Sequence, residues 1–156
     1  MPAITVRLVE AEITRELRRS VLRPGLSVDA PLPGDDEVGV LQLAAFAGLP
    51  GDGDGDPVSA CLLFPEPCPW QPGRPAWRLR SMATDPAWRG RGAGREIIRE
   101  ARQIAIAAGM ELIWCLARQS AIDFYRSQGW QEFGELFDTD LGPHRRMWCE
   151  LSTEQV

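Results

Sequence analysis

The sequence predicts an α/β fold in which helices cover the faces of one mixed β-sheet. Two observations support this fold class. Runs with the apolar pattern of strands alternate with runs that have the period of amphipathic helices. The chain also has 156 residues, of which 44% are hydrophobic, so it is long enough to bury one core. We expect a single domain over residues 1–156.

The N-terminal half is expected to contain a strand, a helix and a pair of strands. Apolar residues recur every four positions at Ile13, Leu17 and Val21, which indicates an amphipathic helix. A stretch rich in Gly and Asp separates the two strands that follow, as in a β-hairpin. The expected bounds are Ile4–Val9 for the first strand, Pro24–Gly25 for the end of the helix, and Val38–Ala47 and Pro57–Phe64 for the hairpin strands.

The loop of that hairpin places Asp52, Asp54 and Asp56 at alternate positions, a pattern that also occurs in calcium-binding loops. An EF-hand loop that begins at Asp52 requires Gly at its sixth position and Glu at its twelfth. This chain has Pro57 and Leu63 at those positions, so we expect a solvated loop and no metal site.

The C-terminal half is expected to alternate strands and helices and to end in a strand pair. A long helix is indicated by apolar residues on one face and alternating Arg and Glu on the other. Ser120 and Asp123 form a capping-box pattern for a shorter helix. The expected bounds are a strand at Trp77–Thr84, a helix from Gly94 to Gly109, a strand at Met110–Leu116, a short helix that ends at Gly129, and strands at Trp130–Phe137 and Arg145–Leu151.

Charge and hydropathy narrow the classes of partner. The net charge is −5, all 17 basic residues are arginines, and these cluster at 89–102 and 145–146. An acidic protein with local arginine clusters suits a small anionic ligand better than a nucleic acid, which favours a broad basic face. No apolar run reaches the length of a membrane span, and the N-terminus lacks the order of a signal peptide. We therefore expect a cytoplasmic protein with no membrane partner.

The four cysteines indicate buried thiols. Cys61, Cys68, Cys115 and Cys149 show no C-x-x-C spacing, and all except Cys68 lie in apolar, strand-like runs. This placement favours free thiols over disulfides or metal ligands.

The run Arg89-Gly90-Arg91-Gly92-Ala93-Gly94 lies between a predicted strand and the long helix. The first N–H groups of a helix have no partner inside the helix, and the helix dipole makes that end partly positive. Glycine lets the backbone approach an anion closely, and arginine adds a permanent charge. The run therefore indicates a pyrophosphate site at the start of the helix.

Two other phosphate motifs do not fit this run. A dinucleotide fingerprint places its third glycine where this chain has Arg95 or Ile97, and a Walker A loop needs a lysine, which the chain lacks. A glycine-rich turn before a surface helix is the alternative, because glycine motifs alone have low specificity.

Two motifs together resemble the GNAT acyltransferases. Arg89-x-x-Gly92-x-Gly94 resembles the family's acetyl-CoA signature, and Met82–Trp88 is similar to the strand that leads into it. Ala121–Trp130 is similar to the family's second signature, a short helix that carries Tyr and ends in Gly-aromatic. The resemblance covers residues 77–130 most specifically. It implies a GNAT-type mixed sheet in which two strands splay apart, with the pantetheine arm of the acyl-CoA in the gap.

The resemblance also implies a cofactor site for acetyl-CoA, used as cosubstrate without a metal. Backbone N–H groups of the loop would hold the pyrophosphate, and main-chain groups of the preceding strand would pair with the pantetheine amides. Many family members have Asn where this chain has Arg118, which is long enough to reach the cofactor or to contact the substrate. The implied cofactor-binding residues are Met82, Ala83, Thr84, Arg89, Gly90, Arg91, Gly92, Ala93, Gly94 and Arg118.

Two side chains are candidates for proton transfer. Tyr125 is the only tyrosine, and the resemblance implies that it protonates the departing thiolate. Its alternative role is aromatic packing beside Phe124, with its hydroxyl at the surface. His144 is the only histidine, and histidine side chains can relay protons at neutral pH, so it is a candidate to relay the proton of the amine. Its alternative is a strand-edge position without a role.

The resemblance implies an N-acetyltransferase that moves an acetyl group from acetyl-CoA to a primary amine by direct transfer in a ternary complex. No cysteine stands beside a paired base, which disfavours an acyl-enzyme. A non-catalytic acyl-CoA-binding or sensing domain is one alternative. A phosphate-binding enzyme of another fold is the second, and the tyrosine helix argues against it.

The acceptor is expected to be a small-molecule or peptide amine. Asp35, Asp36 and the acidic segment 135–140 favour a cationic acceptor on charge alone. No nucleic acid is expected as a partner. Homodimers are common in the family, so a homodimer is the oligomer that the resemblance implies.

Overall fold

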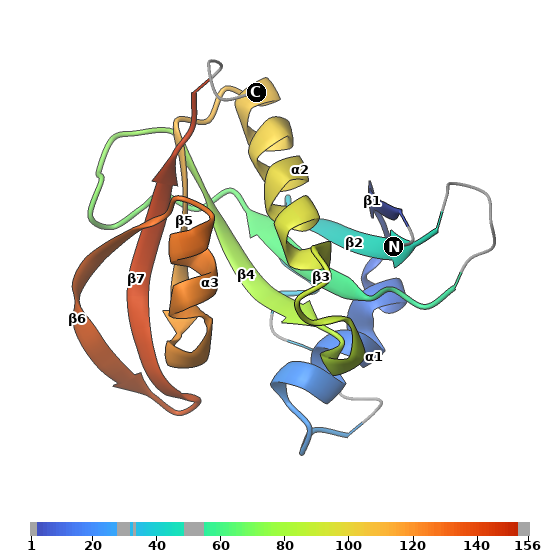
Figure 1. Cartoon of the computed structure of the whole chain (residues 1–156). Helices are drawn as coiled ribbons and strands as arrows, with labels where there is room; N and C mark the ends of the chain where they lie inside the picture. The colour runs from blue at the N-terminus through green and yellow to red at the C-terminus, as the bar shows by residue number, and fades with distance from the viewer. Residues whose placement is uncertain (1–2, 28–31, 33, 49–54, 153–156) are drawn as a thin grey trace. The chain divides into compact units, whose positions relative to one another are not determined.

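A computed structural model describes residues 3–27, 32, 34–48 and 55–152 of the chain (Figure 1). The elements follow the predicted order of strand, helix, three strands, helix, strand, helix and two strands. Their bounds are β1 Ile4–Leu8, α1 Ala11–Leu22, β2 Leu41–Ala47, β3 Ser59–Phe64, β4 Ala76–Thr84, η1 Pro86–Trp88, α2 Ala93–Ala107, β5 Leu112–Arg118, η2 Gln119–Ala121, α3 Ile122–Ser127, β6 Gln131–Thr139 and β7 Gly142–Glu150.

The strands form a mixed sheet of seven strands in the order β1-β2-β3-β4-β5-β7-β6. Strands β4 and β5 are parallel, whereas the pairs β1–β2, β2–β3, β5–β7 and β6–β7 are antiparallel. The predicted hairpin of β2 and β3 and the predicted C-terminal strand pair are both confirmed. The predicted fold class, an α/β fold with a mixed sheet flanked by helices, is confirmed as well.

Contacts divide the chain into two compact units. The first unit comprises Met1–Phe64 and Ser81–Ala101, and the second comprises Pro65–Arg80 and Arg102–Val156. The chain passes from one unit to the other inside β4 and again inside α2. The single domain expected from the sequence stays a prediction.

In the first unit, β2 and β3 are buried on both faces. Leu43 and Leu62 are fully buried, and every residue of β3 is buried. A strand covered on both faces offers few positions to polar side chains, which explains why these two stretches are nearly continuous apolar runs.

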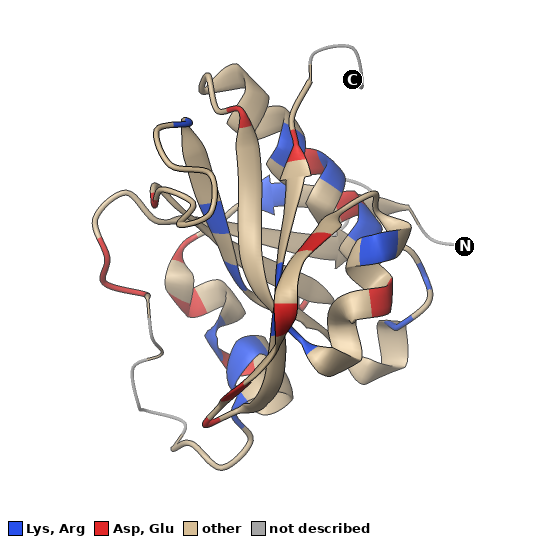
Figure 2. Ribbon diagram, turned by 90° about the vertical axis from the view of Figure 1, so that its left-hand side faces the viewer, with Lys and Arg blue, Asp and Glu red and all other residues tan. Residues whose placement is uncertain are grey.

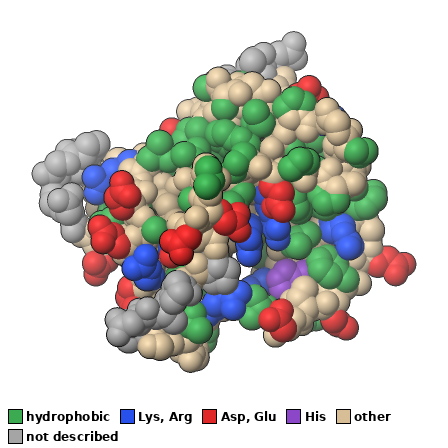
Figure 3. All heavy atoms as spheres, turned by 180° about the vertical axis from the view of Figure 1, so that it is seen from behind, with side chains coloured by type: hydrophobic (Ala, Val, Ile, Leu, Met, Phe, Trp, Pro, Cys, Tyr) green, Lys and Arg blue, Asp and Glu red, His purple; other side chains and the backbone are tan. Residues whose placement is uncertain are grey.

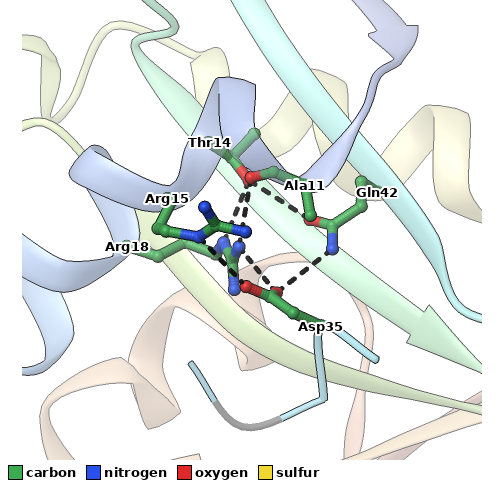
Figure 4. A network of polar contacts seen from close by, with 6 residues as sticks. All are labelled: Ala11, Thr14, Arg15, Arg18, Asp35 and Gln42. Carbon is green, nitrogen blue, oxygen red and sulfur yellow. Dashed lines mark hydrogen bonds and ion pairs between the residues drawn. The ribbon is translucent and has the colours of Figure 1, made fainter. Parts of the chain in front are cut away.

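Helix α1 of the first unit is confirmed, but its buried face differs from the predicted one. The buried residues are Thr14 and Arg18, whereas Ile13 is 45% exposed. The helical period of the apolar residues predicted that the apolar side of α1 is buried. The structure instead buries the polar side, because Gln42 and Asp35, which are distant in sequence, form hydrogen bonds and an ion pair with Thr14 and Arg18 (Figure 4).

Those partners form a polar network around Asp35, whose side chain is 3% exposed. Arg18 forms an ion pair with Asp35 at 2.8 Å, and its Nε donates to the Thr14 hydroxyl at 2.9 Å. The Thr14 hydroxyl donates to Gln42 at 3.2 Å, and Arg15 reaches Asp35 at 3.5 Å. Burial lowers the pKa of Arg18, and the charge of Asp35 opposes that shift. The network joins α1 to β2 and to the segment before β2.

In the second unit, the antiparallel ladder of β5 and β7 has two faces. Ile113 pairs with Cys149 and Cys115 pairs with Met147, so these four side chains share one face. Tyr125 of α3 forms a hydrogen bond with Cys115, and Figure 1 shows α3 in front of β5 and β7. We call this side of the ladder the α3 face.

Residues 65–75 lie on the opposite side of the ladder, which we call the connector face. Trp114 alternates with the residues of the α3 face and packs with Cys68 and Trp70. The ring of Trp70 meets Trp114 edge-on at a centroid distance of 5.4 Å and stacks on Phe133 at 5.3 Å. Aromatic packing therefore covers the middle of this face.

The start of α3 differs from the prediction. Its N-cap is Ala121, and no side chain forms a capping hydrogen bond. Ser120 belongs to the preceding η2 turn, and Asp123 pairs with Arg126 at 3.1 Å. The capping-box interpretation is therefore wrong, because the chain enters α3 through a 3₁₀ turn that already holds Ser120.

The prediction of buried free thiols is confirmed for Cys61, Cys68, Cys115 and Cys149. Burial raises the pKa of Cys61 to about 12 and that of Cys149 to about 11. It also raises the pKa of Cys115, which the hydrogen bond from Tyr125 partly offsets. These shifts keep the thiols protonated near neutral pH.

Candidate acyl-coenzyme A site

The loop between β4 and α2 is built from a 3₁₀ turn and two glycines in the first unit. Asp85 begins the turn and accepts the N–H of Ala87 at 2.9 Å, while Pro86 occupies its first position. Gly90 and Gly92 have φ angles of +75° and +89°, a conformation that glycine adopts without strain. These two glycines therefore turn the chain into α2.

The N-terminus of α2 presents donors that the helix does not use. The N–H of Glu96 donates to the carbonyl of Gly92 at 3.0 Å, so the helical bonds begin at that residue. The N–H groups of Ala93, Gly94 and Arg95 precede this bond and have no partner inside the helix. Gly94 lies within α2 and, unlike Gly90 and Gly92, does not have a positive φ.

Arginine side chains surround this helix end. Arg89, Arg91 and Arg95 are exposed, and the guanidinium of Arg91 lies 5.1 Å from the ring centroid of Trp88. Basic and acidic positions, blue and red in Figure 2, alternate on the exposed side of α2, where Glu96 pairs with Arg99 at 3.4 Å. The helix end thus combines orphan N–H groups with permanent positive charge, which suits a pyrophosphate.

The main-chain groups at the end of β4 point alternately toward β3 and away from it. The Ser59 hydroxyl donates to the carbonyl of Ala83 at 2.9 Å, and the N–H of Asp85 donates at 2.9 Å to the carbonyl of the residue before β3. Alternate residues of a strand direct their polar groups to opposite edges. Those of Met82 and Thr84 therefore face away from β3, and they are the better candidates to pair with a ligand.

Ser81 marks a strained position that the sequence did not reveal. Its φ is +56°, and it is the one non-glycine residue with positive φ among the described residues. Such a conformation costs about 1–3 kcal/mol and gathers at functional sites. In the second unit, β4 and β5 pair through three residues each, Ala76, Trp77 and Arg78 with Leu112, Ile113 and Trp114. These pairs all come before Ser81 in β4. A serine carries no sequence signal for this geometry, and neither did Ser59 for its bond to Ala83.

Tyr125 is buried in the second unit, with 3% exposure. Its ring lies 4.9 Å from Trp130 and 5.2 Å from Phe124, and its hydroxyl bonds to the Cys115 thiol. The packing beside Phe124 that the alternative role required is present, but the hydroxyl does not lie at the surface as that alternative had it. The proton-transfer role of Tyr125 stays a prediction, since packing does not preclude it.

His144 lies inside β7, paired with Arg118 of β5 and Phe137 of β6. Its Nδ1 lies 2.9 Å from the carbonyl oxygen of Gly142 and 3.2 Å from the Thr139 hydroxyl. Because a carbonyl only accepts, Nδ1 carries the hydrogen, and Nε2 of the neutral ring is the proton acceptor.

Tyr125 and His144 lie on opposite faces of the β5–β7 ladder. His144 stands three positions before Met147 of the α3 face, and Arg118 stands three positions after Cys115, so both belong to the connector face. The two candidates for proton transfer therefore cannot contact the same ligand atom from one side. Arg118, a cofactor candidate from its position in the motif, shares the face of His144.

The acidic residues expected to attract a cationic acceptor differ in exposure, and those of segment 135–140, Glu135, Asp138 and Asp140, are all exposed. Asp35 is buried in its ion pair with Arg18 and is not available to a ligand. Asp36 is exposed. Asp52 and Asp54 of the tested calcium motif lie outside the described residues.

Within the described ranges, no group of three or more His, Cys, Asp or Glu side chains is placed to hold a metal ion. None of the helices in the described part of the chain is long and apolar enough to cross a membrane.

The fold and the loop together define the class of this protein. A family profile described as an acetyltransferase (GNAT) domain matches residues 51–132. The uncharacterized N-acetyltransferase YitI of Bacillus subtilis (strain 168) is 31% identical over 154 residues, which are 97% of this chain and 99% of the relative. The chain belongs to the GNAT family of acetyltransferases, enzymes that use an acyl-coenzyme A as acyl donor.

Solved structures show the same fold. A protein from Lactobacillus plantarum assigned as an N-acetyltransferase superposes with a TM-score of 0.74 at 22% identity, covering 96% of this chain and 99% of its own. A GNAT acetyltransferase from Staphylococcus aureus Mu50 gives 0.72 at 14% identity over 96% and 100% of the two chains. An aminoglycoside 6'-N-acetyltransferase complexed with coenzyme A gives 0.68 at 12% identity over 95% and 97%.

Proposed function

We propose that this chain transfers an acetyl group from acetyl-CoA to a primary amine by direct transfer in a ternary complex. The observation that carries the proposal is the N-terminus of α2, where three N–H groups precede the first helical bond and three arginines surround them. The coenzyme A complex of the aminoglycoside 6'-N-acetyltransferase, which has the same fold, supports the choice of donor.

The loop and the end of β4 hold the donor in this proposal. Arg89–Gly94 and the following N–H groups bind the pyrophosphate, and Gly90 and Gly92, which adopt a positive φ, have no side chain to block its approach. Main-chain groups of Met82 and Thr84 pair with the pantetheine amides. The carbonyl of Ala83 already accepts from Ser59, so Ala83 contributes less than the sequence suggested.

Proton transfer is divided between two faces of the second unit. Bound acetyl-CoA supplies a thioester, whose carbonyl carbon forms the bond to the amine nitrogen while its bond to sulfur breaks. Tyr125 gives its hydroxyl proton to the departing sulfur and so gives up its hydrogen bond to Cys115. Nε2 of His144 takes the proton that the amine nitrogen loses.

An acyl-cysteine route has little support. Nucleophilic cysteines need a lowered pKa, whereas burial raises the pKa of Cys61, Cys115 and Cys149. A non-catalytic acyl-CoA sensor remains the second candidate, since it would keep the loop and need no acid. Turnover of acetyl-CoA with an amine separates the two functions.

The remaining features of the proposal are a small-molecule or peptide amine as acceptor, no metal, and a cytoplasmic location. Homodimerisation stays a prediction.

The loop assignment predicts that Gly92→Asp weakens acetyl-CoA binding at least about tenfold, because hydrogen bonds to a charged group contribute about 1.5–3 kcal/mol each. The carboxylate would stand at the proposed pyrophosphate site. Calorimetric titration of acetyl-CoA measures the effect, and wild-type protein should gain thermal stability from the ligand by mass action.

Gly92→Ala is the matched control, because it carries the same backbone strain at φ +89° without the charge. A Cβ at this position would lie 3.5 Å from the guanidinium of Arg95, an ordinary contact. The alanine variant should bind more tightly than the aspartate variant. Equal affinity of wild type and Gly92→Asp would show that the pyrophosphate lies elsewhere.

A further inference from the structure

Three basic side chains meet at one end of the connector face. Arg118 of β5 pairs with His144 of β7, and Arg146 follows two positions later on the same strand. Side chains two positions apart in a strand share a face, and directly paired side chains on neighbouring strands lie side by side. All three belong to the second unit, so their neighbourhood follows from strand register alone.

Arg146 turns toward this end of the face. Its guanidinium carbon lies 4.4 Å from the ring centroid of Phe137, the residue paired with His144, although its own partners in the ladder are Leu116 and Phe133. The histidine ring also lies beside Phe137, with centroids 6.2 Å apart. The aromatic ring therefore brings the guanidinium into the row of Arg118 and His144.

Arg146 has no carboxylate partner among the residues that the structure describes, although it is only partly exposed. The preceding residue shows the contrast. Arg145 lies on the α3 face and pairs with Glu132 at 3.0 Å. A half-buried guanidinium beside an aromatic ring attracts an anion more strongly than an exposed one, because the local dielectric constant is lower.

The two acidic residues that follow Phe137 in this hairpin form no ion pair with Arg146 in the described part of the chain. Asp138 follows Phe137 in β6, so its side chain belongs to the other face of the strand. Asp138 and Asp140 are both exposed. Figure 3, which views the molecule from the side opposite to Figure 1, shows the purple histidine with both blue arginine and red acidic side chains near it.

We infer that Arg118 and Arg146, on either side of His144, bind an anionic group of the acceptor, so that the substrate class is an amine that also carries a carboxylate, as an amino acid does. Guanidinium groups bind carboxylates in bidentate geometry, which makes arginine the suitable residue for this purpose. The inference rests on the proposed acetyltransferase function. It replaces the cationic acceptor expected from the sequence, whose strongest residue, Asp35, is buried in an ion pair.

The test compares amino acids with their α-amides as acceptors: glycine with glycinamide and L-leucine with L-leucinamide. Release of the coenzyme A thiol gives kcat/KM for each. An amino amide keeps more of its amine unprotonated than the parent acid near neutral pH, so intrinsic reactivity favours the amide. We expect the acid to be preferred at least about tenfold within each pair, the effect of one charge-assisted hydrogen bond.

Arg146→Gln should lower kcat/KM for the acids at least about tenfold, mainly through KM, and change the amides less than about threefold. Arg146→Lys keeps the charge and should restore part of the loss. Arg145→Gln is the matched control, since it removes a neighbouring charge on the other face, and it should leave the preference for acids unchanged.

The possible results separate this inference from the proposed function. Turnover with equal or better use of the amides, unaffected by Arg146→Gln, would overturn the anionic acceptor and leave the acetyltransferase function standing. Acetyl-CoA binding without thiol release for any amine would contradict the transferase function and, with it, the acceptor class.

Discussion

Asp35→Asn is expected to lower the free energy of unfolding by about 3–5 kcal/mol, the cost of removing one partner from a buried ion pair. The substitution leaves the guanidinium of Arg18, which is 1% exposed, without its opposite charge at 2.8 Å. It also weakens the link between α1 and β2 through Thr14 and Gln42. Urea denaturation followed by circular dichroism measures the loss as a lower midpoint with an unchanged slope.

Asp36→Asn is the control for that experiment, because Asp36 is the adjacent residue and is exposed. Its effect should stay within about 0.5 kcal/mol, as for most surface substitutions. If the two variants unfold at the same urea concentration, the network in Figure 4 does not stabilise the fold as the structure indicates.

Tyr125→Phe is expected to lower kcat at least about tenfold, and by up to about 10⁴-fold if no water replaces the acid, because general acid catalysis contributes about 10²- to 10⁴-fold. The affinity for acetyl-CoA should not change. The ring contacts with Phe124 and Trp130 are kept, and the hydrogen bond to the Cys115 thiol, a weak acceptor, is lost. Steady-state kinetics together with calorimetry separates the two effects.

Cys115→Ala provides the control for the lost hydrogen bond, since it removes the same bond and keeps the phenol. A much smaller fall of kcat in this variant would place the effect in the acid itself. Turnover of Tyr125→Phe within about twofold of wild type would remove the hydroxyl from the mechanism. His144 would not be its replacement at the sulfur if the donor lies on the α3 face, since His144 belongs to the connector face.

Most of the architecture could be predicted because each element has a local signal. The apolar positions of α2, among them Ile97 and Ala101, are buried as the helical period requires. The predicted strand at Trp77–Thr84 is β4 with one additional residue, Ala76. Where the signal was not local, the prediction failed. The buried face of α1 depends on Asp35 and Gln42, which no periodicity of the helix reveals.

The candidate site was predictable in its residues more than in its geometry. The loop glycines could be found from the sequence, and Gly90 and Gly92 have the expected positive φ. The strain at Ser81 had no sequence signal. Strand β7 begins at Gly142 and not at Arg145 as expected, so His144 lies inside the strand and pairs with Arg118 instead of standing at the strand edge. The register of this pairing determines the face that His144 occupies.

The most direct test of the central claim measures coenzyme A release and acetylated amine in the same reaction. Purified protein is mixed with acetyl-CoA, with and without the amino acids and amides named above, and both products are quantified by a thiol reagent and mass spectrometry. Direct transfer predicts one acetylated amine for each coenzyme A released, with no burst of coenzyme A before the amine is added. A burst equal to the enzyme concentration would show an acyl-enzyme, and acetyl-CoA binding without either product would show a sensor. Either result would contradict the proposed function.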